Sequence, residues 1–243
     1  MVVLNGAMIL KLFPAFAYLG LLGPKARRTG LLLGTSIGIG LVYALCTQAD
    51  LKQIRAATPR GYEPAYGIDA SWLAVQVFTQ SDTAGAMARV LGYVFIATVA
   101  LLAVRFRLQS PPWPESDRAD YLAAFRMGSA IYLGTFLLGN NFDYRLMFLL
   151  FTLPQLSAWS AGGESPVRTV ARVTLTAVLL ACWVRVLASH AGYHLAGVVL
   201  LLELYAKWAA FGGVCFLLVA SLPTRLKTTV TSDSGTGVPP VRS

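Results

Sequence analysis

Residues 139–145 form the densest group of polar side chains at the edge of an apolar stretch in this chain. They read Gly-Asn-Asn-Phe-Asp-Tyr-Arg, which puts two amides, a carboxylate, a phenol and a guanidinium side by side. These groups suit a phosphate or a sugar, because Arg145 could hold an anion while Asp143 orients it. A purely structural interpretation also stands: Asp143 caps the following helix and pairs with Arg145, while Tyr144 anchors at the lipid headgroups.

A lysine and a proline lie close together near the start of the chain. Lys11 precedes Pro14 by three residues within an apolar stretch. Both could face one side of a helix whose hydrogen-bond ladder the proline interrupts. One interpretation is a kinked helix that presents Lys11 to a polar cavity, and the other is that Lys11 extends along its helix to the membrane surface.

Two residues of opposite charge lie in the last apolar stretch. Glu203 precedes Lys207 by four residues, which is the favourable order for an ion pair within a helix. Arg185 could pair with Glu203 from a neighbouring helix or reach the lipid phosphates. Because an ionisable group near the bilayer centre costs about 2.5 to 3.5 kcal/mol on insertion scales, each of these groups requires a partner or a wet cavity.

The sequence predicts neither a metal site nor a cofactor. His190 and His194 have a spacing that could bind a metal on one helical turn, but no carboxylate or third ligand is adjacent to them. The cysteines Cys46, Cys182 and Cys215 lie in apolar stretches and match no zinc or redox spacing. Phosphate-binding glycine loops and Ser/His/Asp arrangements are also missing from the sequence.

The elements that must position these groups are transmembrane helices. Of the 243 residues, 56% are hydrophobic and 13% are charged, against about 25% charged in an ordinary soluble domain. The mean hydropathy is +0.62. A spanning helix needs about 20 mostly apolar residues, and the composition therefore predicts an all-α, polytopic bundle of about seven spans. The predicted spans are residues 6–22, 30–47, 90–104, 121–138, 146–159, 169–188 and 195–220.

The basic residues predict how this bundle is oriented. Lys and Arg accumulate on the cytoplasmic side of membrane proteins. With seven spans, most of the Lys and Arg residues fall on the side that also holds the C-terminus, so we expect the N-terminus outside and the C-terminus in the cytoplasm. The net charge of +9 then reflects topology in the inner (plasma) membrane. Nucleic acid is not an expected partner, because the bases are scattered at span ends and do not cluster on one polar element.

The longest predicted loop, residues 48–89, lies on the outer side. It contains Asp69 and several aromatic residues, and its stretch from 71 to 80 alternates apolar and polar residues. This pattern predicts a short amphipathic helix or a re-entrant segment at the membrane surface.

The chain is expected to consist of one transmembrane domain and a tail. Residues 1–222 form the predicted domain, with an extended cytoplasmic linker at 105–120 that contains three prolines. Residues 223–243 are too poor in apolar side chains to offset the entropy of ordering, so we expect a disordered cytoplasmic tail.

Two motifs resemble those of a known enzyme family. Residues 10–14, Leu-Lys-Leu-Phe-Pro, resemble the Lys-x-x-Pro helix start of multi-spanning glycosyltransferases that use polyprenyl-phosphate sugars, the GT-C superfamily and notably its family 87-like members. Residues 141–145, with the apolar run after them and Pro154-Gln-Leu, are similar to the later Asp-Tyr-Arg block of the same proteins. The two motifs occur in the required order and on the outer side, and together they frame most of the chain.

The resemblance implies a hexosyltransferase that transfers a sugar from a polyprenyl-phosphate donor at the outer face. Lys11, Arg145, Tyr144 and Asn141 would contact the substrate, and the two cations would stabilise the phosphate as charge develops on it. In the family, an acidic first outer loop carries the general base, and nothing in this chain matches that loop. The catalytic residue is therefore unassigned, with the carboxylates of residues 143 and 69 as candidates, and a partner membrane chain could supply the missing helices.

A second function class is a non-catalytic membrane scaffold or a partner in lipid or polysaccharide export. The enzyme hypothesis requires Lys11, Arg145 and part of the loop 48–89 to line one outward cavity, whereas the scaffold hypothesis requires each of them to be paired locally. A transporter would instead need a cavity at the membrane midplane around Glu203, Lys207 and Arg185. Membrane lipid is an expected partner in every case.

Overall fold

The structure is a computed structural model that describes residues 65–109, 119–137, 141–162, 166–189 and 196–222, with short pieces between residues 34 and 53. This part of the chain is almost entirely helical, which confirms the predicted class for these residues. The α-helices are α4 (Ile68–Thr79), α5 (Asp82–Gln109), α6 (Ala119–Leu137), α7 (Leu153–Ala161), α8 (Pro166–Ser189) and α9 (Ala196–Ser221). A 3₁₀ helix, η2 (Asp143–Thr152), leads into α7.

Several predicted features lie outside the described residues. They are Lys11 and the span at 6–22, most of the span at 30–47, both histidines, residues 110–118 of the inner linker, and the tail at 223–243.

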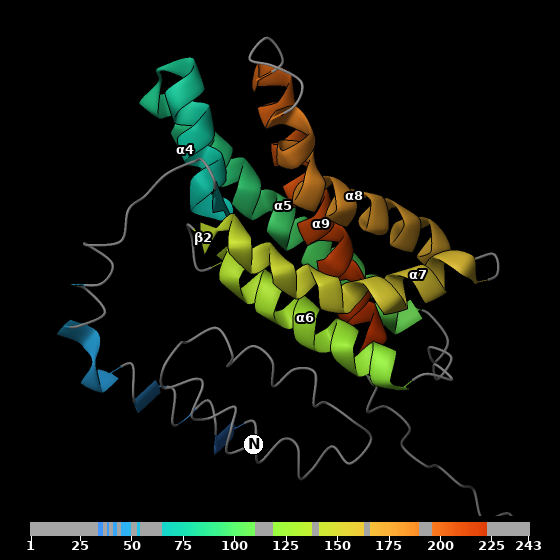
Figure 1. The fold of residues 1–243 in the computed structure, drawn as a ribbon. Helices are drawn as coiled ribbons and strands as arrows, with labels where there is room; N and C mark the ends of the chain where they lie inside the picture. The colour runs from blue at the N-terminus through green and yellow to red at the C-terminus, as the bar shows by residue number, and fades with distance from the viewer. Residues whose placement is uncertain are drawn as a thin grey trace, which may run out of the picture.

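Consecutive long helices run in alternating directions through the bundle (Figure 1). The turn between α4 and α5 and the end of α8 lie at one end of the bundle, and the start of α6 and the end of α9 lie at the other. Helix α9 packs against α5, α6 and α8, so it is the central helix. At its C-terminal end, the Arg126 guanidinium of α6 donates to the backbone carbonyl of Ser221, and the rings of Phe106 and Phe216 lie 5.1 Å apart.

A two-stranded sheet joins two segments that are far apart in the sequence. Strand β1 (Ala65–Tyr66) pairs antiparallel with β2 (Asn141–Phe142), with Ala65 opposite Phe142 and Tyr66 opposite Asn141. The sheet connects the segment before α4 to the turn between α6 and η2. Both segments are predicted to lie on the outer side, but neither strand was predicted, because two residues are too few to show a period-2 pattern.

Much of the predicted outer loop is helical. Of the two alternatives predicted for 71–80, the structure has a short helix, α4 (Ile68–Thr79), while its place at a membrane surface stays a prediction. Helix α4 ends where Gln80 adopts a left-handed conformation with φ of 52°. Helix α5 then begins at Asp82 and not at residue 90 as predicted. The Ser81 hydroxyl accepts a hydrogen bond from the Ala84 N–H, and Asp82 adds a negative charge to the first turn. Both features stabilise a helix N-terminus, which explains the earlier start.

The fifth predicted span, residues 146–159, is not one continuous α-helix. It is divided between η2 and α7, and Pro154 lies in the first turn of α7. Proline lacks an N–H and clashes with the preceding turn inside a helix, but it fits the start of a new one. The proline therefore explains why the helix type changes at this point.

The core lies where α6, η2, α8 and α9 meet, and large aromatic side chains fill it. The Phe136 ring lies 4.4 Å from that of Phe211 and 5.0 Å, edge on, from that of Trp208. Gly128 lets η2 approach α6 closely, since a Cβ at this position would lie 2.5 Å from the carbonyl oxygen of Phe148.

Three helices of the described part are long and apolar enough to cross a membrane. They are Asp82–Gln109, Pro166–Val184 and Gly197–Ser221. Large apolar side chains cover their outer surfaces, for example Leu101 at 70% exposure. These helices support the assignment as a membrane protein, whereas seven spans and their orientation stay predictions.

Candidate functional site

A buried lysine lies at the centre of the most polar part of the described core. The Lys207 side chain on α9 is 6% exposed, and its Nζ donates to Glu203 Oε1 at 2.5 Å, Asp143 Oδ1 at 2.7 Å and the Ala65 carbonyl oxygen at 2.8 Å. An ammonium group has three N–H donors. Each donor therefore has one acceptor, and the three acceptors belong to α9, η2 and β1. We call Lys207, Glu203 and Asp143 the Lys207 cluster.

The local structure explains why these groups meet. Glu203 lies one helical turn before Lys207, so both project from the same face of α9. Asp143 follows directly after β2, and Ala65 begins β1. Because β1 pairs with β2, the Ala65 carbonyl and the Asp143 carboxylate arrive together at that face.

Buried hydroxyl groups surround the Lys207 cluster. The Tyr132 hydroxyl donates to the backbone carbonyl of Lys207 at 3.0 Å. The Tyr66 hydroxyl lies 2.7 Å from Thr135 Oγ1, and the rings of Tyr66 and Tyr132 stack with centroids 5.7 Å apart. These contacts fix α6, α9 and β1 against one another.

The cluster leaves little room for a substrate. With every group ionised, one ammonium faces two carboxylates, and the Glu203 and Asp143 side chains are 5% and 22% exposed. The adjoining cavity, bounded in part by Tyr66 and Leu200, has a volume of about 20 Å³. A cavity of this size holds about one water molecule. The ammonium ties two carboxylates and one carbonyl together, and the arrangement does not present an open polar cleft.

The structure describes the surroundings of some residues that the sequence singled out. The Glu203–Lys207 ion pair is confirmed. Asp143 contacts Lys207, a partner that the sequence analysis did not name. Asp69 lies in the first turn of α4, half-buried, and accepts a hydrogen bond from Trp72 Nε1 at 3.0 Å.

The remaining predicted residues are described only in part or not at all. Asn141, Tyr144 and Arg145 have described backbone in β2 and η2, but their side chains lie outside the described structure, as does that of Arg185 in α8. The structure therefore brings Asp143 to Lys207 and Ala65, while the predicted contacts of Lys11 and Arg145 stay predictions.

Sequence reasoning missed the long-range contacts of the cluster. Lys207 is 64 residues from Asp143 and 142 residues from Ala65 along the chain. The available signal was that each charge lies at or within an apolar stretch and so requires a partner. That signal does not say which of the possible partners it meets.

The described residues contain no group of three His, Cys, Asp or Glu side chains that could hold a metal ion. Cys46, Cys182 and Cys215 are free thiols.

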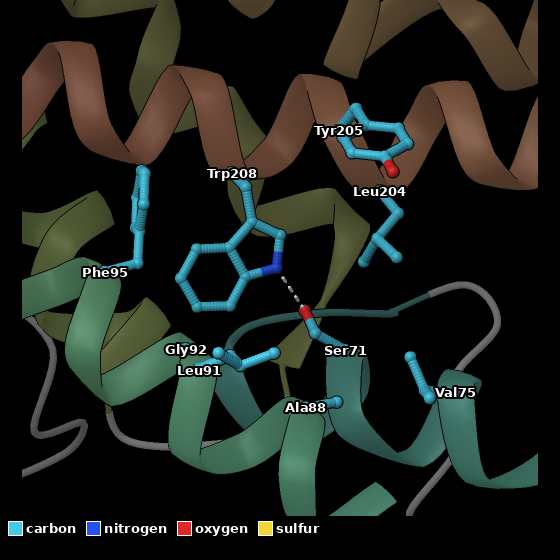
Figure 2. Close-up of a pocket in the computed structure, with 9 residues that line it drawn as sticks. All are labelled: Ser71, Val75, Ala88, Leu91, Gly92, Phe95, Leu204, Tyr205 and Trp208. Atoms are coloured by element: carbon cyan, nitrogen blue, oxygen red, sulfur yellow. Dashed lines mark hydrogen bonds between the residues drawn. The ribbon is translucent and has the colours of Figure 1, made fainter. Parts of the chain in front are cut away.

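Beside the Lys207 cluster lies a larger and mostly apolar groove, which we call the apolar groove. Nine residues of α4, α5 and α9 line it, and Figure 2 labels all of them. Its volume is about 390 Å³. Across it, Trp208 Nε1 donates to Ser71 Oγ at 2.9 Å, and the Trp208 ring passes so close to Gly92 that a Cβ there would lie 3.0 Å away.

No protein-family model, no curated protein and no solved structure matches this chain. The functional proposals below therefore depend on the geometry of the cluster and the groove.

Proposed function

We propose that this chain is a multi-pass membrane protein of the glycosyltransferase type that handles a polyprenyl-phosphate sugar at the outer face of the plasma membrane. It would have about seven spans, with the N-terminus outside and the C-terminus in the cytoplasm. The observation that supports this best is the junction of β1 with β2, together with the bonds from Lys207 to Asp143 and Ala65. This junction unites two predicted outer segments, one of which carries the Asp-Tyr-Arg block.

In this proposal the substrate contacts come from the polar residues beside the junction. Lys11 and Arg145 bind the phosphate, while Tyr144 and Asn141 bind sugar hydroxyls. Asp143 positions the block, because its carboxylate is bound to the Lys207 ammonium at 2.7 Å. The general base is Asp69 or comes from a partner membrane chain that completes the site.

A second candidate function, a non-catalytic membrane scaffold or export partner, also has a specific observation in its favour. The three donors of Lys207 are all engaged, and the cavity beside the cluster measures about 20 Å³. A closed junction of this kind suits a structural connection between helices.

Donor binding separates the two candidates. The full chain is reconstituted in lipid nanodiscs, and binding and turnover of a radiolabelled polyprenyl-phosphate hexose are measured. Losing a charged contact to the phosphate should weaken binding about tenfold or more in Arg145→Ala and Lys11→Ala. Arg168→Ala, which removes a cation from the first turn of α8, is the matched control and should bind like the parent chain.

A folded parent protein that neither binds nor consumes the donor would contradict the glycosyltransferase proposal and support the scaffold. Equal losses in Arg168→Ala and Arg145→Ala would also contradict it, because binding would then follow total charge and not the proposed site.

Orientation is tested separately by labelling. A peptide tag after residue 243 should react with a membrane-impermeant reagent only after the cells are permeabilised. Labelling in intact cells would refute the proposed orientation and would put residues 141–145 on the cytoplasmic side.

A further inference from the structure

The interior of the apolar groove suits a hydrocarbon chain. Its floor contains the Trp208 N–H and the Ser71 hydroxyl, which bond to each other, and Ser71 Oγ in turn donates to the Gly67 carbonyl at 3.0 Å. Both polar groups are therefore satisfied without a ligand. A polar solute would lose hydration here and gain little in exchange. The volume of about 390 Å³ falls within the range of about 300–1,000 Å³ that is usual for ligand pockets.

The groove opens on a surface that suits lipid. Two of its walls, α5 and α9, are long and apolar enough to cross a membrane. Its rim residues Leu91 and Tyr205 are 64% and 71% exposed. Beyond the rim, the apolar surface continues through Val94 and Leu201, each 56% exposed. An occupant can therefore enter from the bilayer without passing through water.

A cation and two aromatic rings lie beside the groove. The Arg89 guanidinium lies 5.8 Å from the centre of the Trp72 ring and 5.9 Å from that of Tyr93. Trp, Tyr and Arg are typical of the headgroup layer of a membrane. Arg89 adjoins Ala88 in sequence, and Ala88 lines the groove. Phe95 lines the other end of the groove. It lies six residues after Arg89 on α5, which is about 9 Å along the helix axis at 1.5 Å per residue.

From the apolar walls, the opening toward the bilayer and the adjacent cation, we propose that the apolar groove is a binding site for one acyl chain of an anionic phospholipid. The phosphate of this lipid contacts Arg89, and the chain runs between α4, α5 and α9 past Trp208 (Figure 2). This inference does not depend on glycosyl transfer. It requires only that α5 and α9 lie in a membrane.

The test uses Trp208 as a reporter of chain occupancy. In the full chain, Phe replaces the other four tryptophans, which are Trp72, Trp113, Trp159 and Trp183. At position 72 this keeps an aromatic ring beside Arg89. The protein is placed in phosphatidylcholine nanodiscs that contain increasing fractions of phosphatidylglycerol with brominated acyl chains, which quench tryptophan on contact. We expect half-maximal quenching at about a tenfold lower fraction of brominated phosphatidylglycerol than of brominated phosphatidylcholine. A tenfold ratio corresponds to the one additional charged contact that the anionic lipid makes with Arg89.

Two pairs of variants locate the site. Ala88→Phe fills the groove and should remove the high-affinity quenching, because overpacking costs about a tenfold or greater loss of affinity. Ala86→Phe adds the same ring at an exposed position of the same helix and should leave the quenching unchanged. Arg89→Gln should make the two lipids equally effective, whereas Arg105→Gln near the other end of α5 should not.

Identical quenching curves for Ala88→Phe, Ala86→Phe and the parent would overturn the proposal, because bulk lipid would then be the quencher. Trp208 emission that no brominated lipid quenches would also overturn it, since another part of the chain or a protein partner would then cover the groove. Circular dichroism of each variant establishes that the helices are intact. Because no sugar donor is present, these outcomes are independent of the glycosyltransferase proposal.

Discussion

The Lys207 cluster and the apolar groove are built in opposite ways, although the small cavity beside the cluster shares Ser71 and Leu204 with the groove. The cluster contains three charged groups and adjoins a cavity of about 20 Å³, while the groove is lined mostly by apolar side chains and has a volume of about 390 Å³. Two faces of α9 produce this difference. Residues 203 and 207 project toward η2 and β1, whereas residues 204 and 208 project toward α4 and α5.

The contrast shows which kind of site a lipid-facing fold leaves open. Charged groups in an apolar environment require nearly complete pairing, so the structure closes around them. An apolar hollow can remain open at little cost where lipid chains fill it. Space for a ligand is therefore found beside the charges and not among them.

Among the substitutions that test this contrast, removing the Lys207 ammonium should change the free energy of unfolding most. Lys207→Met removes the cation that the two carboxylates share and should lower the free energy of unfolding by about 3–5 kcal/mol. Denaturant titration of the purified protein in mixed micelles, followed by circular dichroism, measures this change. Arg168→Met is the control at the start of α8 and should change stability by less than about 0.5 kcal/mol. A loss below about 1 kcal/mol in Lys207→Met would show that the cluster is not tightly formed.

The close packing of α6 on η2 is tested by adding one methyl group at Gly128. Gly128→Ala would place a Cβ 2.5 Å from the Phe148 carbonyl oxygen and 2.8 Å from Phe151 Cβ. Overpacking of this kind should cost about 1–3 kcal/mol in the same titration. Gly197→Ala is the matched control, because nothing lies within 4 Å of its Cβ, and it should be neutral or slightly stabilising. Similar effects of the two changes would argue against close packing of α6 on η2.

The hydroxyl contacts around the cluster should contribute least. Tyr66→Phe removes the bond between the Tyr66 hydroxyl and Thr135 Oγ1 but keeps the ring that stacks on Tyr132. A buried neutral hydrogen bond contributes about 1 kcal/mol, and the unfolding titration should show a loss of this size. Tyr205→Phe, at a position that is 71% exposed, is the control and should have no measurable effect. A loss in Tyr66→Phe as large as that of Lys207→Met would contradict this order, because the hydroxyl would then stabilise β1 as much as the charges do.

Hydropathy predicted the helices far better than it predicted how they are joined. The long stretches that became α5, α6, α8 and α9 are visible in the sequence because apolar length is a local property. The early start of α5 depends on capping, and the change of helix type before Pro154 depends on the proline ring. A hydropathy average over many residues does not detect either feature. The β1–β2 pairing is a long-range contact between two-residue strands and left no periodic signal.

The candidate site was predictable in composition but not in geometry. The spacing of Glu203 and Lys207 identified their ion pair, because an interval of four residues on a helix fixes the distance. Asp143 was identified as important, but its contact with Lys207 depends on how α6, η2 and α9 pack. The groove depends on Gly92 allowing the close approach of Trp208, and an isolated glycine in an apolar helix does not reveal this.

The central claim is that the Asp143–Lys207 contact holds the segments of β1 and β2 together, and a double-mutant cycle tests it most directly. The free energy of unfolding is measured for the parent, Asp143→Asn, Lys207→Met and the double variant, with Asp69→Asn replacing Asp143→Asn in a control cycle. We predict a coupling energy of about 1–3 kcal/mol for residues 143 and 207, and additivity within about 0.5 kcal/mol for residues 69 and 207. Additive effects of Asp143→Asn and Lys207→Met would contradict the claim.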